Sequence, residues 1–412
     1  MLNPIVLSIP IFFFLIGIEI IYDRITHKNL YRMNDAVSNI SCGIFEQITG
    51  VFAKVITVAL YDLLYQHYRF FTIPNSWIWL VVLFFGIDLA YYWAHRMSHE
   101  INIFWVGHVV HHQSEEYNLS VALRQGALQK IFTAFFYLPL ALLGFNTYWF
   151  IFLGAFNTLY QFWIHTEAIR KLGFLERFMN TPSHHRVHHG RNPKYIDRNH
   201  AGVFIIWDKM FGSFQKEEEH PVYGITTPTQ CWDPVTAHWR PLSNLWADWR
   251  VIREWKYKIQ LLFMKPGWLP EKYGGYRSPK EVFPESYRKF ETRLNREMSW
   301  YLLIHFILIL TGTSFFLFGL SNFSSSQQII FTALITFSVM TTGFLFEGKS
   351  WALYAELVRL VIVSSALIYS LQNHALFPVF AIFFATLVLA SVYWLRRFYS
   401  DPSMKISPIE ES

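Results

Sequence analysis

The chain alternates long apolar runs with polar connections, and one long polar stretch divides the runs into two sets. An apolar run of about 17 to 25 residues can cross a bilayer as a helix. Such runs occur near residues 4–22, 42–65, 76–94, 127–144, 147–165, 300–320, 327–345, 352–371 and 375–395. This pattern predicts an all-α multi-pass membrane protein built as a helical bundle.

Two of these runs contain charged residues or proline, so the sequence does not decide whether they cross the membrane. The run 127–144 contains Lys130 and Pro139, and the run 42–65 contains Glu46 and Lys54. A charged side chain is costly inside hydrocarbon, and proline bends or ends a helix. Each of these two runs is therefore predicted either to cross the membrane or to form a re-entrant or interfacial segment.

The lysines and arginines predict which side each connection faces. If the end of the third run near His95 faces the cytoplasm, alternation places residues 23–41, 95–126, 166–299, 346–351 and the C-terminal tail there. These segments hold nearly all the basic residues of the connections, whereas the opposite connections contribute only Arg69. Cytoplasmic loops of membrane proteins are enriched in such residues. We therefore expect the histidine-rich segments described below to share the cytoplasmic face.

The composition agrees with a membrane protein and excludes several other classes. Hydrophobic residues make up 53% of the chain and charged residues 16%, whereas soluble domains average about 25% charged residues. The net charge of +6 reflects the bias of cytoplasmic loops, so no nucleic-acid partner is expected. The two cysteines, Cys42 and Cys231, form neither a disulfide framework nor a thiolate metal site.

The polar stretch 166–299 is rich in aromatic and basic residues, as in CWDPVTAHWRPLSNLWADWRVIREWKYK. Aromatic and basic side chains interact favourably with lipid head groups. Aromatic side chains also form the core of soluble subdomains. We expect five segments along the chain: N-terminal transmembrane helices (1–75), a catalytic core (76–225), a cytoplasmic aromatic and basic interfacial segment (226–299), a C-terminal four-helix transmembrane region (300–398) and a disordered tail (399–412).

Ten of the seventeen histidines fall between residues 95 and 189, in the sequences HRMSH, HVVHH, IHTE and SHHRVHH. Residues three or four apart share one face of a helix, so HxxxH and HxxHH direct several imidazoles toward an ion. Ten nitrogens are too many for one metal, so the count predicts a di-metal cap on the helical bundle. The candidate ligands are His95, His99, His108, His111, His112, His165, His184, His185, His188 and His189.

The ligand type narrows the chemistry of this cap. Imidazole suits zinc, copper, iron and nickel, and a lone structural zinc needs only four ligands. Open all-nitrogen sites beside a membrane favour redox chemistry on a lipid, with two ferrous ions and dioxygen as co-substrate. The protein would hold the alkyl chain in an apolar slot between helices. A membrane metal transporter is a minor alternative, but it requires ligands along a path at mid-membrane depth.

Several carboxylates accompany the histidines. A carboxylate that accepts the second ring N–H of a ligand histidine fixes the tautomer of that ring. Asp88 lies within an apolar run, where an acid is costly unless it serves a function. The other candidates are Glu100, Glu115, Glu116, Glu167 and Asp197. The histidines outside the spacing pattern are expected to be ordinary surface or packing residues: His27, His67, His200, His220, His238, His305 and His374.

The pattern HxxxH, HxxHH and HxxHH resembles that of the fatty acid hydroxylase and sterol desaturase superfamily, which comprises non-haem di-iron membrane oxygenases. Three stretches are similar to its tetrahydrobiopterin-dependent, ether-lipid-cleaving branch: YYWAHRMSHEINIFWVGHVVHHQSEEYNLSVALRQ, LYQFWIHTEAIRKLGFLERFMNTPSHHRVHHGRNPKYIDRNHAGVFIIWDKMFGSF and VYGIT. The resemblance is dense from about residue 85 to 225. It implies a monooxygenase that hydroxylates the ether-linked carbon of a 1-O-alkylglycerol or of its lyso-phospholipid and releases a fatty aldehyde and the glycerol moiety.

The resemblance also implies roles for single residues. The ligand roles carry to nine of the histidines, while His184 stands one place before its HxxHH triplet and is either a ligand or a support. Glu100 follows the first pair and is expected, like Asp88, to be a functional acid near the site. Tetrahydrobiopterin is expected on the resemblance alone, and no residue is assigned to bind it. The location implied is the endoplasmic reticulum of a eukaryote or the inner membrane of a bacterium.

An alternative function has the same di-iron chemistry but a different substrate. A sterol, fatty acyl or carotenoid hydroxylase or desaturase of the same superfamily would receive electrons from a separate electron-transfer protein. Such a donor leaves no trace in the sequence of the enzyme, so this alternative stays open at the level of sequence.

Overall fold

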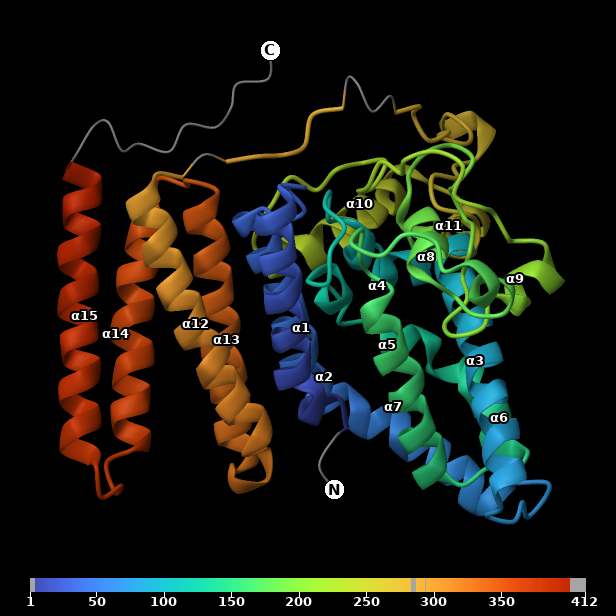
Figure 1. Ribbon diagram of the computed structural model, residues 1–412, viewed down its shortest axis with the longest axis horizontal. Coiled ribbons are helices and arrows are strands. Elements are labelled where there is room, and N and C mark those ends of the chain that lie inside the picture. Colours follow the sequence, from blue (N-terminus) through green and yellow to red (C-terminus); the bar gives the residue numbers. More distant parts are fainter. Residues whose placement is uncertain (1–3, 283–286, 293, 401–412) are drawn as a thin grey trace. The chain divides into compact units, whose positions relative to one another are not determined.

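The computed structural model describes residues 4–282, 287–292 and 294–400 (Figure 1). The tail predicted at 399–412 therefore lies outside the described residues from residue 401 onward. The regular secondary structure of the described residues is helical, and β-structure among them is limited to isolated bridge residues, such as the pair Met179 and Phe204. The predicted all-α fold is confirmed. The chain divides into two compact units, residues 1–229 with 237–288 and residues 230–236 with 289–412.

The first unit contains most of the helices. The histidine-bearing segments lie at one end of this unit, and an apolar core lies at the other. Its helices are α1 (Pro4–Thr26), α2 (Met33–Tyr68), α3 (Trp77–Glu100), α4 (Asn102–His112), α5 (Gln129–Thr133), α6 (Leu138–Leu142), α7 (Thr147–Trp163), α8 (Pro182–His189), α9 (Ile206–Phe211), α10 (Pro234–Val251) and α11 (Trp255–Phe263). The second unit contains α12 (Arg296–Phe318), α13 (Ser325–Phe346), α14 (Ala352–Ser370) and α15 (Phe377–Ser400).

Fewer helices can cross a membrane than the apolar runs suggested. Within the described residues, α3, α12, α13, α14 and the part of α15 up to Arg397 are long and apolar enough. The two parts of α2, Met33–Ala53 and Val55–Tyr68, would make a sixth span if they act together. The protein is thus a multi-pass membrane protein, and among its described residues five or six helices meet this criterion of length and composition, against nine apolar runs in the sequence.

The other apolar runs form a broken run of short helices, a shorter helix and helix α1. The run 127–144 is broken into α5, the 3-10 helix Ala134–Tyr137 and α6, and Pro139 lies at the start of α6. Lys130 extends to Glu46, with 2.6 Å between Nζ and Oε1, so each of these two charges has a partner. The run 147–165 gives α7, which at 17 residues is shorter than the five spans. The run 4–22 forms α1, which is not among the five helices that meet the criterion for a membrane span.

An apolar core joins α2, α3 and α6 at the end of the first unit where loops 69–76 and 143–146 meet. Tyr61, Leu83 and Ile87 pack there in one buried cluster. The Phe70 N–H donates to the Leu142 carbonyl at 2.7 Å and fastens the two loops. The histidine-bearing end of α3 and helices α4 and α8 lie at the opposite end, uppermost in Figure 1. The loops 69–76 and 143–146 therefore lie at the opposite end of this unit from the histidine-bearing segments.

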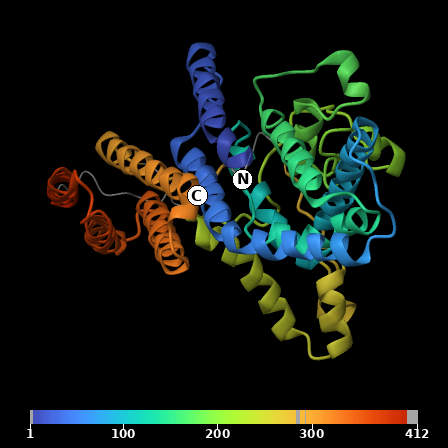
Figure 2. The ribbon, with the colours of Figure 1, turned by 90° about the horizontal axis from the view of Figure 1, so that it is seen from below.

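Helices α10 and α11 form a hairpin that projects from the rest of the first unit (Figure 2). Its inner side packs Leu245 and Leu261 against Val106 of α4 in one buried cluster. Its outer side leaves Trp246 and Trp255 exposed to more than half of their surface. Exposed tryptophans are typical of the membrane interface, so the interfacial role of segment 226–299 stays a prediction with this observation in its favour.

A close backbone approach holds α4 against the loop that follows it. A Cβ atom added to Gly126 would lie 1.8 Å from the Gly107 carbonyl oxygen, so residue 126 must be glycine for the loop to pack there. The Arg124 guanidinium stabilises the same loop, since its Nε donates to the Val110 carbonyl at 2.7 Å. The position of α4, which carries three candidate ligands, thus depends on this contact.

We expect Gly126→Ala to lower the free energy of unfolding by about 1–3 kcal/mol, because the added methyl overpacks a backbone contact. Gly154→Ala is the control, since its added Cβ meets nothing within 4 Å. As a helical glycine replaced by alanine, it should leave stability unchanged or raise it by up to about 1 kcal/mol. Thermal unfolding in detergent compares the two, and equal midpoints would contradict the role given to Gly126.

Candidate metal centre

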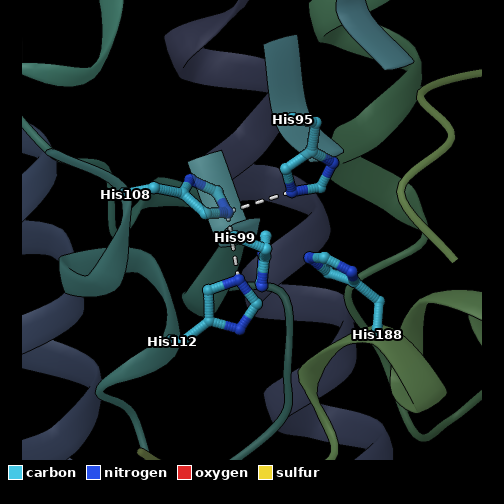
Figure 3. Close-up of side chains that lie close together, drawn as sticks. All are labelled: His95, His99, His108, His112 and His188. Atoms are coloured by element: carbon cyan, nitrogen blue, oxygen red, sulfur yellow. Dashed lines mark hydrogen bonds between the residues drawn. The ribbon is translucent and has the colours of Figure 1, made fainter. Parts of the chain in front are cut away.

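The structure gathers nine of the ten candidate ligands into two buried groups. The five-histidine group consists of His95, His99, His108, His112 and His188 (Figure 3). The four-histidine group consists of His111, His165, His185 and His189. Within each group, one ring nitrogen from every member lies within 4.8 Å of those of the others. Two separate sites, as the histidine count predicted, are therefore available.

Helix geometry explains how each HxxHH triplet serves both groups. Successive residues of an α-helix turn by about 100°, so positions i and i+4 lie close together while i+3 points to their other side. On α4, His108 and His112 face the five-histidine group and His111 faces the other. On α8 the division is reversed, because only His188 joins the five-histidine group. Helices α4 and α8 thus line both sites together.

The remaining ligands come from two helix ends. His95 and His99 lie one turn apart at the end of α3, and His165 lies two residues after the last residue of α7. The rings approach closely: the Nε2 atom of His108 lies 3.0 Å from the Nε2 atoms of His95 and His112 (Figure 3). A neutral imidazole carries one N–H, so His108 cannot donate to both neighbours.

Backbone carbonyls fix the tautomer of several rings. A carbonyl oxygen only accepts, so an Nδ1 atom bonded to one must carry the hydrogen, which leaves Nε2 bare to face the group. Four rings show this arrangement: His95 to the His200 carbonyl at 2.8 Å, His111 to Arg124 at 2.7 Å, His165 to Gln161 at 2.7 Å and His188 to Arg198 at 3.0 Å.

Burial keeps these imidazoles uncharged. It lowers the pKa of His111 to about 4. Burial, reinforced by neighbouring imidazoles, also holds the pKa of His112, His188 and His189 well below the ordinary value of 6.5. The neutral ring is the form that binds metals. The buried Nε2 atoms of His188 and His189 have no hydrogen-bond partner among the described residues. These observations fit a metal ion in each group.

The carboxylates differ from what the sequence suggested. Asp197 takes the expected place beside a ligand, with its Oδ1 atom 3.7 Å from Nδ1 of His99. Glu100 instead accepts a hydrogen bond from the Arg96 Nε at 2.9 Å. Glu167 accepts one from the Tyr223 hydroxyl. Glu115 and Glu116 lie near Arg32. Neither Glu100 nor Glu167 has a hydrogen bond or ion pair to a candidate ligand in the described part of the chain.

Asp88 has a positioning role. Its carboxylate, fully buried, accepts hydrogen bonds from the backbone N–H groups of Val203 and Phe204 and from the side chains of Trp207 and Asn157, at 2.6 to 3.0 Å. The expectation that it accepts a ring N–H from a histidine is therefore wrong. Instead, Asp88 fastens the segment after His200 to α3, and the carbonyl of His200 orients the His95 ring.

Two further histidines lie near the groups without belonging to them. His184 belongs to neither group, because its ring packs against Phe214 with the ring centroids 5.5 Å apart. His200, expected to be an ordinary surface or packing residue, is fully buried with its ring centroid 5.1 Å from that of His99. Spacing gave no signal for His200, because it lies outside any helical histidine motif and reaches the site through the segment that Asp88 holds.

Comparisons with known proteins point to lipid oxygenases. The fatty acid hydroxylase family model matches residues 80–213, which contain both histidine groups. Human alkylglycerol monooxygenase is 38% identical over 359 residues, covering 85% of this chain and 79% of the human protein. The Danio rerio alkylglycerol monooxygenase is 36% identical, with 86% and 80% covered. Mouse lathosterol oxidase is 28% identical over 34% of this chain and 48% of its own. No solved structure matches significantly.

We expect His188→Ala to reduce the bound metal from two ions per chain to one or fewer and to abolish turnover, because it removes a ligand of the five-histidine group. His184→Ala is the matched control from the same helix and should retain both ions. Metal analysis of the purified proteins makes the comparison, with membrane insertion unchanged in each. Full metal content in His188→Ala would contradict the ligand assignment.

We also expect Asp197→Asn to weaken binding of one metal ion by about tenfold, because the carboxylate beside His99 raises the basicity of that ligand. Asparagine matches the shape of aspartate and tolerates the positive φ of 56° at this position. Competition with a chelator measures the affinity. Glu100→Gln, which removes an acid paired only with Arg96 in the described residues, should leave it unchanged.

Proposed function

Because this chain belongs to the alkylglycerol monooxygenase family, we propose that it is a membrane-bound di-iron monooxygenase that hydroxylates the ether-linked carbon of 1-O-alkylglycerol lipids. The observation that carries the proposal is the pair of buried, all-imidazole groups at the end of α3, one of the candidate membrane spans. Imidazole ligands suit iron, and the sequence similarity extends over most of the chain rather than over the histidine motifs alone.

The chemistry follows from the substrate. Two ferrous ions, when bound, would activate dioxygen for insertion of one oxygen atom into a C–H bond of the ether-linked carbon. The hydroxylated carbon is a hemiacetal, which releases a fatty aldehyde when its bond to the glycerol oxygen breaks and a proton moves to that oxygen. The chain contributes ligands of fixed tautomer, through carbonyl acceptors such as those of Arg124 and Gln161. It also contributes burial, which keeps water from the reacting atoms.

We propose tetrahydrobiopterin as the reductant. Insertion of one oxygen atom leaves the second to be reduced to water, which requires two electrons and two protons from a donor. A soluble pterin can reach a site at the polar end of a membrane protein. The family resemblance supports this choice over a protein electron donor, and the proposal assigns no pterin-binding residue.

We propose that the histidine groups face the cytoplasm, in the endoplasmic reticulum of a eukaryote or in the inner membrane of a bacterium. The support is the excess of lysine and arginine in the connections at the histidine-bearing end. The meeting of loops 69–76 and 143–146 at the other end agrees with this arrangement. A sterol or fatty acyl substrate is the alternative, but similarity to lathosterol oxidase covers only about a third of the chain.

Anaerobic reconstitution with ferrous iron tests the proposal. We expect two iron ions per chain and release of fatty aldehyde from a 1-O-alkylglycerol when tetrahydrobiopterin and oxygen are added. A 1-O-acylglycerol of the same chain length is the control and should yield no aldehyde, because it lacks the ether-linked carbon. Aldehyde release supported by reduced cytochrome b5 and not by pterin would reject the reductant. Retained zinc without oxygen uptake would reject the function.

A further inference from the structure

The hairpin of α10 and α11 carries an exposed apolar stripe on each helix. The stripe of α10 consists of Trp239 and Trp246, and that of α11 consists of Trp255, Ile259 and Phe263. Each of these side chains exposes more than half of its surface. Residues four or seven positions apart share one face of an α-helix. Each helix therefore presents an apolar face outside the protein core.

The opposite faces of the two helices are fixed in place. Leu245, Ile252 and Leu261 pack with Val106 of α4 in one buried cluster, so the stripes cannot turn inward. The hairpin lies at the histidine-bearing end of the first unit (Figure 1) and projects sideways when the unit is seen from below (Figure 2), so it runs across the candidate span α3. Amphipathic helices that lie at this level bury their apolar face at the boundary between lipid head groups and acyl chains.

The hairpin also carries positive charge that its own carboxylates do not neutralise. Asp248 forms an ion pair with Arg277, at 2.9 Å between Oδ1 and Nη2, and Glu254 forms one with Lys272. Both of these cations lie beyond the hairpin, so its two carboxylates are already engaged. Four exposed cations of the hairpin form no ion pair with a carboxylate among the described residues: Arg240, Arg250, Arg253 and Lys256. Unpaired cations beside apolar stripes match a bilayer surface that contains anionic lipids.

The hairpin is fastened to both ends of α4, the helix that carries three of the candidate ligands. At the start of α4, the Asn102 N–H donates to the Met264 carbonyl at 2.9 Å, and the Asn102 side chain donates to the Leu261 carbonyl at 3.1 Å. Just after α4, the Gln113 side chain donates to the Ala237 carbonyl of α10 at 2.9 Å. An interaction that fixes the hairpin against the membrane therefore also fixes the position of α4.

We propose that the outer face of the α10–α11 hairpin binds anionic lipids of the membrane that the protein spans, and that this docking holds helix α4 and its ligands in place. An acidic protein is another partner that cations attract. The tryptophan-rich stripes favour lipid, because tryptophan is enriched at membrane interfaces and the spans of this protein already place it in a bilayer. The inference goes beyond the proposed function, since it depends neither on which lipid is oxidised nor on the reductant.

Quenching of tryptophan fluorescence by brominated lipids measures which lipids surround the hairpin. The full-length protein is placed in phosphatidylcholine nanodiscs that contain an increasing fraction of brominated lipid, either phosphatidylglycerol or phosphatidylcholine. We expect the anionic brominated lipid to quench at a lower mole fraction, and the two curves give its affinity relative to phosphatidylcholine. Arg250→Gln combined with Arg253→Gln should lower this relative affinity about fivefold or more, because each lost cation weakens attraction to an anionic surface.

Two further variants locate the signal. Lys216→Gln removes an exposed cation that precedes three glutamates, away from the stripes, and should keep the relative affinity of the wild type. Trp246→Phe combined with Trp255→Phe keeps the stripes apolar and should remove the excess quenching by the anionic lipid, because these rings report it. Excess quenching that survives this replacement arises elsewhere and overturns the proposal.

Equal quenching of the wild type by the two brominated lipids would also overturn the proposal, and it is the result that an acidic protein partner predicts. The same conclusion follows if the double arginine variant keeps the relative affinity of the wild type. Unchanged unfolding midpoints show that all variants fold.

Retention of bound metal tests the link to α4. The metal-loaded protein in nanodiscs with or without phosphatidylglycerol is mixed with a chelator, and the rate of metal loss is measured. We expect slower loss in the anionic nanodiscs for the wild type and for Lys216→Gln. The double arginine variant should lose metal at the same rate in both kinds of nanodisc. A rate for the wild type that does not depend on the lipid would overturn the link between docking and α4.

Discussion

The structure depends on one electrostatic constraint, which is that unprotonated imidazole nitrogens face one another inside the protein. His111 and His165 both donate their Nδ1 hydrogens to backbone carbonyls, yet their bare Nε2 atoms lie only 3.2 Å apart. Two lone pairs at this distance repel, and burial prevents either ring from taking up a proton. A cation held by these nitrogens would relieve the repulsion, which would couple metal binding to the folding of this end of the chain.

Much of the first unit serves to hold these rings in place. Helices α4 and α8 each contribute to both groups, so a shift of either helix would disturb two sites at once. Gly126 allows the loop behind α4 to pack against it, and Arg124 in that loop provides the carbonyl that orients His111. Asp88 plays the matching part for His95 through the segment around His200. The polar groups buried here are therefore positioning devices for the ligands.

The sequence predicted what depends on local spacing and missed what depends on tertiary contacts. The ligand positions on α4 and α8 follow from helical periodicity, so nine histidines were placed together correctly. His184 shares that periodicity but faces Phe214. His200 and the backbone partners of Asp88 at Val203 and Phe204 belong to a segment more than a hundred residues away from Asp88, and no periodic pattern predicts them. The run 127–144, which the sequence left open between a span and an interfacial segment, folds into short helices with Pro139 in the first turn of α6.

The most direct test of a two-site, all-imidazole centre is X-ray absorption at the iron edge of the reconstituted protein, combined with iron analysis per chain. The account predicts two irons per chain, a first shell of nitrogen and oxygen atoms, and the outer-shell scattering typical of several imidazoles on each metal. One iron per chain, a sulfur shell, or a shell dominated by carboxylate oxygens would contradict it.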